Sequence, residues 1–145
     1  MNRYHPIQSF CMTCGDGNEV VQRNVRGGSR LAQTILCCSG AGQHHEFGQR
    51  GLRCMSQCKR SCVASLSVSG RFSYMFGDLD AAEPGRVEAL KDLNPPCLAA
   101  PEGILRREAR PFPLRERILG RLPQPGSSFG LVTKTEEMSA CIVRT

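Results

Sequence analysis

The stretch that decides the fold is residues 62–80, CVASLSVSGRFSYMFGDLD. Its first half alternates apolar and small polar residues, Gly70 interrupts the pattern, and the second half places Phe72, Tyr74 and Phe76 on one side. Alternation with a period of two indicates a strand with one buried face, and a glycine between two such runs indicates a tight turn. The sequence therefore predicts a β-hairpin here, with the three aromatic side chains packed on helices.

Downstream of the hairpin, a helix is expected to begin at Asp80 or Glu83, with Pro84 in its first turn. Its apolar side consists of Val87, Leu90 and Leu93, and the run Asn-Pro-Pro at 94–96 is expected to end it. Residues 97–125 are rich in arginine and proline, and Pro113 is expected to open one short helix with three residues facing the core: Leu114, Ile118 and Leu119. We expect residues 123–145 to form a disordered tail, which leaves residues 1–122 as one metal-binding domain.

Upstream of the hairpin, residues 5–11 are expected to form a short strand and residues 47–53 a weak one. Between them, Ser29 is expected to cap a helix that runs to about Cys38, with Leu31, Ile35 and Leu36 on one face. A helix that crosses between the two strands allows them to be parallel, and the hairpin adds an antiparallel pair. The predicted fold class is therefore α/β, a small mixed sheet with flanking helices and a C-terminal hairpin and helix.

Nine cysteines among 145 residues are the unusual feature of the composition. Five of them cluster in two short runs, as Cys11 and Cys14 in CMTC and as Cys54, Cys58 and Cys62 in CMSQCKRSC. Converging thiolates bind soft metals, and four of them complete either a tetrahedral zinc site or an iron–sulfur cluster. The spacing alone favours neither metal, and buried inert thiols are the third explanation. We expect the five cysteines to form the functional centre.

Two other groups of side chains are weaker candidates. The adjacent His44 and His45 could ligate a metal, although solvated histidines in a glycine-rich loop explain them more simply. Cys37 and Cys38 are neighbouring thiols at the end of a predicted helix. No nucleophile with its base and no phosphate-binding loop is evident, so we expect a binding protein or electron carrier rather than an enzyme.

The expected compartment is the cytoplasm. The first ten residues lack the apolar core of a signal peptide, and no apolar run approaches a membrane span. Clustered cysteines in a reducing compartment favour metal or redox chemistry over disulfides. The net charge is +6, but its basic residues are spread along the chain without a recognition motif, so we expect no nucleic-acid and no membrane partner. The arginine-rich stretch 106–121 is a candidate docking surface for an acidic protein redox partner.

Residues 53–80, RCMSQCKRSCVASLSVSGRFSYMFGDLD, resemble the signature of a bacterial family of uncharacterised proteins that are predicted to bind metal. Members carry an N-terminal CxxC, a later CxxxC-containing run and a hairpin that closes on a YxFGDL-like motif, here residues 74–79. Residues 112–123, FPLRERILGRLP, are similar to the family's C-terminal element. Genes of this family lie near cobalamin and cobalt functions, which implies a role in electron supply or metal handling there.

The same region is similar, more distantly, to thioredoxin-like 2Fe–2S ferredoxins. That resemblance implies a thioredoxin-like ferredoxin layout, an electron-transfer function and a 2Fe–2S cluster held by Cys11, Cys14, Cys54 and Cys58. The sequence departs from the ferredoxin pattern in the close spacing of its first pair and in the extra thiol of Cys62. A zinc- or cobalt-binding protein without redox function and an inert cysteine-rich fold are the alternatives.

Overall fold

The computed structural model describes residues 6–15, 25–38, 48–80, 83–127, 132–133 and 138. The strands are β1 (Ile7–Cys11), β2 (Gly48–Leu52), β3 (Ala64–Ser67), β4 (Ser73–Phe76) and β5 (Ile118–Leu122). The helices are α1 (Gly27–Cys38), α2 (Pro84–Asp92) and α3 (Asn94–Ala99). Single 3-10 turns lie at Cys58–Arg60 (η1), Pro101–Gly103 (η2), Arg107–Ala109 (η3) and Phe112–Leu114 (η4).

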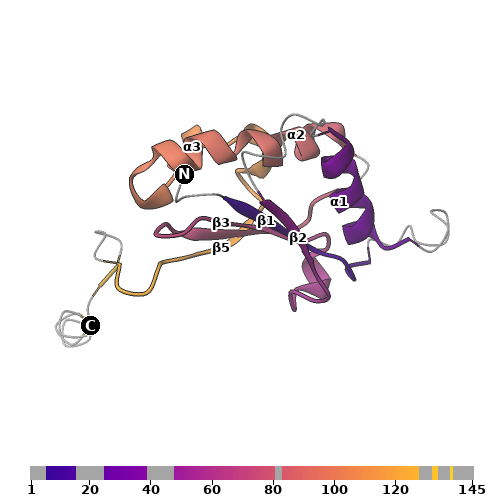
Figure 1. Ribbon diagram of the computed structural model, residues 1–145, viewed down its shortest axis with the longest axis horizontal. Coiled ribbons are helices and arrows are strands. Elements are labelled where there is room, and N and C mark those ends of the chain that lie inside the picture. Colours follow the sequence, from indigo (N-terminus) through magenta and orange to yellow (C-terminus); the bar gives the residue numbers. More distant parts are fainter. Residues whose placement is uncertain are drawn as a thin grey trace.

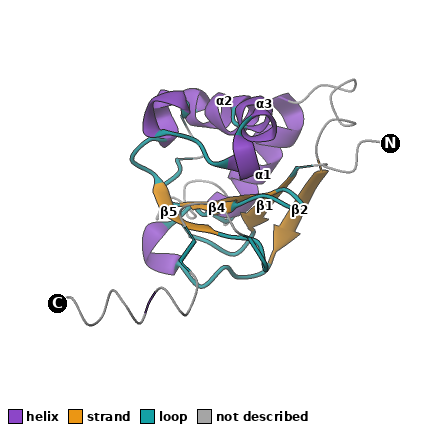
Figure 2. Ribbon diagram, turned by 90° about the vertical axis from the view of Figure 1, so that its left-hand side faces the viewer, coloured by secondary structure: helices purple, strands orange, loops and turns teal. Residues whose placement is uncertain are grey.

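The five strands form one mixed sheet in the order β2-β1-β3-β4-β5. β1 and β2 are parallel, and the other neighbouring pairs are antiparallel. Figure 1 shows α2 and α3 along one face of the sheet and α1 near β2, and Figure 2 shows all three helices on the same side of the sheet. The predicted α/β class, the parallel first pair and the hairpin at residues 62–80 are confirmed.

The main core fills the space between the sheet and the helices. Alternate residues of the strands point into it, among them Phe10, Leu66, Tyr74 and Phe76, none more than 2% exposed. The helices contribute Leu31, Ile35 and Leu90, and Leu93, between α2 and α3, joins them. The buried Tyr74 hydroxyl donates to the carbonyl of Gly103 and accepts from the N–H of Leu105, each at 3.0 Å. The aromatic side of the hairpin is thus core, as predicted.

We call the face of the sheet opposite to the helices the polar face, after its serines. Its central strands present small side chains from Ser9, Ser65, Ser67 and Ser73. The Arg50 side chain donates to the Ser9 hydroxyl at 2.7 Å. At one end of this face lie the cysteines of β1 and of the loop that follows it. They belong to a second, smaller group of buried side chains.

The predicted short helix opened by Pro113 is wrong. The chain makes only the single turn η4 there and then enters β5, which pairs antiparallel with β4. Gly120 and Pro123 disfavour a continued helix. A strand at this position, by contrast, pairs the backbone N–H and C=O groups along the second edge of β4. Leu114 is nevertheless fully buried, and Ile118 packs against the main core.

Two helix boundaries also differ from the prediction. α1 begins at Gly27, and Ser29 does not cap it; the Ser29 hydroxyl instead donates to the carbonyl of Met12 at 2.9 Å. The Asn-Pro-Pro run follows the end of α2 at Asp92, as predicted, but it also opens α3, because proline fits the first turn of a helix.

The boundary between the domain at 1–122 and a tail at 123–145 stays a prediction. Of the described residues beyond it, Gln124 donates its side-chain amide to the carbonyl of Arg71 at 3.0 Å. The Ser127 hydroxyl lies 2.7 Å from a carboxylate oxygen of Glu102. The chain is therefore tied to the β3–β4 turn and to η2 for at least five residues past β5.

Candidate metal centre

The first cysteine pair lies in the connection between β1 and α1. Cys11 is the last residue of β1, and its N–H donates to the carbonyl of Val63 at 3.0 Å. The N–H of Met12 donates to Leu52 at 2.8 Å, which extends the contact with β2. The N–H of Gly28, in the first turn of α1, donates to the carbonyl of Cys14 at 3.1 Å. The CMTC loop is therefore held by two strands and by a helix N-terminus.

Cys11 and Cys14 are each 1% exposed, and their thiols hydrogen-bond to one another. With Val63 they form the small buried group on the polar face of the sheet, and Met55 and Met75 pack against it. Neither cysteine forms a disulfide. Two thiols in contact, surrounded by apolar side chains, are donors of the type that soft metals bind.

The two thiols have opposite pKa shifts. Burial acts to raise the pKa of Cys11, but hydrogen bonds from the Cys14 thiol, from the backbone of Met55 and from Thr13 outweigh it, so the net pKa is lowered. The pKa of Cys14 is raised to about 11, first by burial and then by its hydrogen bond with Cys11, although the Ser61 side chain acts in the other direction. Cys11 is therefore the member of the pair that gives up its proton more readily.

The second cysteine pair lies in the loop between β2 and β3, which includes η1. Cys54 and Cys58 are both exposed, and neither forms a disulfide. Ser56, between them, has a positive φ of 59°, and its N–H donates to the sulfur of Cys54 at 3.3 Å. A backbone amide aimed at sulfur stabilises a thiolate, and such contacts surround the sulfurs of metal centres.

Hydrogen bonds hold this loop against the first pair at both of its ends. At one end the Thr13 hydroxyl donates to the carbonyl of Arg53. At the other the Ser61 hydroxyl donates to the carbonyl of Cys58 at 2.6 Å and also hydrogen-bonds with the Cys14 thiol. The two exposed thiols are thus carried by a segment that borders the buried pair.

An ion pair fixes the end of the same loop to β4. The Arg60 guanidinium contacts one carboxylate oxygen of Asp78 through two nitrogens, at 2.8 and 2.6 Å. The N–H of Asp78 donates in turn to the carbonyl of Arg60 at 2.7 Å. Asp78 belongs to the YMFGDL run that closes the hairpin, so this motif positions the end of the cysteine loop.

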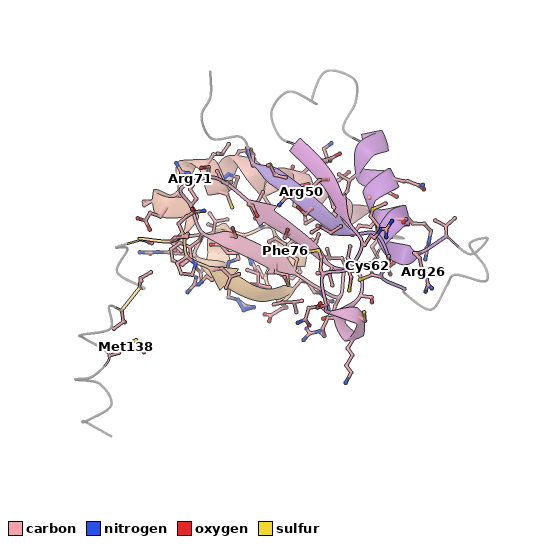
Figure 3. All side chains as sticks on the ribbon, turned by 60° about the horizontal axis from the view of Figure 1, so that its bottom comes forward. Arg26, Arg50, Cys62, Arg71, Phe76 and Met138 are labelled. Carbon is pink, nitrogen blue, oxygen red and sulfur yellow. The ribbon has the colours of Figure 1, made fainter. Side chains whose placement is uncertain are left out.

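Cys62 lies on the other side of the sheet from the first pair. It is fully buried and belongs to the main core, whereas the next residue, Val63, belongs to the small group with Cys11 and Cys14. The alternation of β3 explains this, because residues 62, 64 and 66 point toward the helices and residue 63 toward the opposite face. Figure 3 shows Cys62 at the same end of the molecule as Arg26 and opposite to Arg71.

Of the five predicted site cysteines, the structure brings the thiols of Cys11 and Cys14 together. Within the described ranges no group of three or more His, Cys, Asp or Glu side chains is arranged so that it could hold a metal ion. His44 and His45 lie outside the described residues, as do the side chains of Cys37 and Cys38. Sequence reasoning missed three polar residues that contact the cysteines, Thr13, Ser56 and Ser61. Their proximity in sequence could have indicated them, because each lies within three residues of a clustered cysteine.

The exposure of the thiols predicts their order of alkylation in metal-free protein. Among the cysteines whose side chains the structure describes, N-ethylmaleimide at pH about 8 should modify Cys54 and Cys58 first, because the thiolate must be reachable by the reagent. Cys97 should react only after unfolding, since it is 2% exposed and burial raises its pKa to about 12. Peptide mass spectrometry with and without denaturant measures this order. Modification of Cys97 as fast as Cys54 in the folded protein would contradict it.

The model of one protein family, described as Protein of unknown function (DUF1636), matches residues 9–124. The match begins in β1, ends just after β5, and includes all five clustered cysteines. No curated protein and no solved structure matches the chain significantly. Among the described residues, no helix has both the length and the apolar character that crossing a membrane requires.

Proposed function

The chain belongs to the DUF1636 family, whose function is unknown, and we propose from its own residues that it is a metal-binding protein. The proposed ligands are the thiolates of Cys11, Cys14, Cys54 and Cys58, and the proposed metal is a 2Fe–2S cluster. Such a cluster transfers one electron at a time, so the protein would act as an electron carrier or redox adaptor. A thioredoxin-like ferredoxin layout, a cytoplasmic location and a link to cobalamin or cobalt metabolism are part of the same proposal.

The observation that carries the proposal is the position of the cysteine loop against the buried pair. Residues 53 and 58 are joined by hydrogen bonds to Thr13 and, through Ser61, to Cys14. Two cysteine pairs that are distant in sequence therefore border one another at one end of the sheet. Four thiols are a donor set that suits iron–sulfur clusters and zinc, so the residues present fit the proposed group.

Neighbouring groups of this chain also suit a thiolate-bound centre. Backbone amides hydrogen-bond to the sulfurs of Cys11, Cys14 and Cys54, and such bonds stabilise negative charge on sulfur. Val63, Met55 and Met75 cover the first pair and limit the access of water. In iron–sulfur proteins these two factors, hydrogen bonds to sulfur and burial, set the reduction potential. Because Cys54 and Cys58 are exposed, their thiols would have to move toward the first pair when the metal binds.

Cys62 is not among the proposed ligands, although it was one of five candidates. Its thiol is buried with the aromatic and aliphatic side chains of the main core, on the face of the sheet opposite to Cys11. For the Cys62 thiol to reach the first pair, the alternation of side chains along β3 would have to shift by one residue. Val63 and every following residue of β3 would then point to the wrong face of the sheet. We assign Cys62 to the core.

The test is to purify the protein without oxygen and to measure its metal. A 2Fe–2S protein should be reddish-brown, absorb visible light, and contain iron and acid-labile sulfide in equal amounts. The matched control is the double variant Cys54→Ser, Cys58→Ser, which should be colourless. Colourless wild-type protein with one zinc per chain would refute the iron–sulfur cluster and favour the zinc alternative. Folded protein that takes up neither metal would refute metal binding.

A further inference from the structure

A second surface feature is a groove between the start of α2 and the segment that precedes β5. Its volume is ≈ 410 Å³, and the residues that matter for its chemistry are Glu83, Arg107, Phe112, Arg115, Glu116 and Arg117. Three arginines, two glutamates and one aromatic residue line a single open groove. The core and the cysteine site use none of these side chains.

The segment around the groove carries much of the protein's positive charge. Residues 106–121 include six arginines and two glutamates, in a chain whose net charge is +6. Arg107 and Glu116 form an ion pair and neutralise one another. The Arg115 guanidinium donates to the carbonyls of Arg110 and Glu108, at 3.2 and 3.0 Å, and both of these acceptors are uncharged. The groove therefore offers positive charge to an acidic partner.

Phe112 supplies an apolar anchor in the same groove. Its side chain is 79% exposed, the largest exposure of any large hydrophobic residue in the described part of the chain. The Arg115 guanidinium lies over the ring, 5.5 Å from its centre. Aromatic residues and arginine are enriched among the residues that contribute most to binding at protein interfaces.

The groove is connected to the cysteine loop through the end of β4. The N–H of Gly77 donates to the carbonyl of Arg117 at 2.9 Å, and the next N–H, of Asp78, donates to the carbonyl of Arg60 at 2.7 Å. Arg60 is the last residue of η1, which begins at Cys58. A partner in the groove would therefore contact a segment that is hydrogen-bonded, through residues 77 and 78, to the loop that carries the exposed thiols, and Lys59 on η1 adds a further exposed positive charge.

We propose that this groove docks an acidic polypeptide segment of a protein partner, with an apolar side chain of that segment packed on Phe112. The proposal rests on the proposed function, since it makes the groove the place where a redox partner is held close to the cysteine centre. A polypeptide fits better than a nucleic acid because Glu83 and Glu116 also line the groove. Their carboxylates repel negative charge of either kind, but they accept hydrogen bonds from peptide N–H groups, which a phosphate backbone lacks.

The test measures binding of a fluorescein-labelled peptide, DEDFED, by fluorescence anisotropy. The peptide should bind at about 0.02 M NaCl and about tenfold more weakly at about 0.3 M, because salt screens exposed charges. Phe112→Ala and Arg117→Glu should each weaken binding about fivefold. Arg26→Glu makes the same charge change outside the groove and should leave the affinity close to that of the wild type. Circular dichroism confirms that each variant is folded.

Two outcomes would overturn the docking proposal. One is equal affinity of the wild type and the folded Arg117→Glu variant for the peptide. The other is tighter binding of a single-stranded oligothymidylate of the same charge, which would assign the groove to nucleic acid. Repeating the titration with the Cys54→Ser, Cys58→Ser protein separates the two proposals, because the peptide needs the groove but not the metal. Retained peptide binding in that protein supports the groove whatever the metal analysis shows.

Discussion

Replacing Cys54 with serine is expected to lower metal affinity about 100-fold or more, and the same result is expected at Cys11, Cys14 and Cys58. Serine has nearly the same size as cysteine but lacks the soft thiolate. A loss of metal affinity therefore shows that the thiolate is a ligand and does not reflect a change in packing. Metal and acid-labile sulfide per chain, measured on oxygen-free preparations of equal concentration, give the readout. The two exposed positions are the most informative because serine is well tolerated there.

Cys62→Ala is the control for this series. It should keep the full metal content while the free energy of unfolding falls by about 1–2 kcal/mol, since a buried sulfur is removed from the main core. Metal loss without stability loss is thereby predicted at Cys54 and Cys58, and stability loss without metal loss at Cys62. A folded Cys62→Ala protein without metal, together with a Cys14→Ser protein that keeps it, would refute the ligand assignment.

Gly28→Ala is expected to lower the free energy of unfolding by about 3 kcal/mol or more. A Cβ at this position would overlap the carbonyl oxygen of Cys11, would lie 2.9 Å from the carbonyl carbon, and would meet the Cβ of Cys14 at 3.5 Å. The two Cys11 atoms belong to the backbone of the CMTC loop and cannot move aside as a flexible side chain would. Either α1 moves away from the loop or the loop changes shape, and the first cysteine pair is disturbed in both cases.

Gly85→Ala provides the matched control, because Gly85 lies in the first turn of α2 and a Cβ there meets nothing within 4 Å. Alanine favours helix, so this variant should be as stable as the wild type or more stable by about 0.5 kcal/mol. Urea unfolding of metal-free proteins compares the two substitutions. Equal stability of Gly28→Ala and wild type would show that α1 does not approach the loop as closely as described.

The parts of the fold that were predictable from the sequence are those that depend on neighbouring residues. The β3–β4 hairpin follows from alternation around Gly70, and α2 follows from Pro84 and its apolar side. β5 was not predictable in this way, because its residues adopt a strand by pairing with the edge of β4, about forty residues earlier in the chain. Local periodicity at Leu114 and Ile118 resembled a helix, and the long-range pairing overrode it.

The candidate site was predictable in composition but not in arrangement. The two cysteine runs identify the residues, and their spacing does not say which side of the sheet each thiol occupies. For Cys62 a signal was present, since extending the alternation of residues 64–67 backwards places residue 62 on the helix side. The contacts of Thr13 and Ser61 join segments that only the folded sheet brings together, so no local pattern could indicate them.

The division of buried side chains between the two faces of the sheet has a consequence for how this family can diverge. The aromatic and aliphatic core holds the helices to one face, and the proposed ligands lie on the other face or in an exposed loop. Substitutions at Cys54 and Cys58 therefore remove proposed ligands and leave that core unchanged. Duplicated copies of such a gene can change or lose the proposed metal site while they keep the same scaffold.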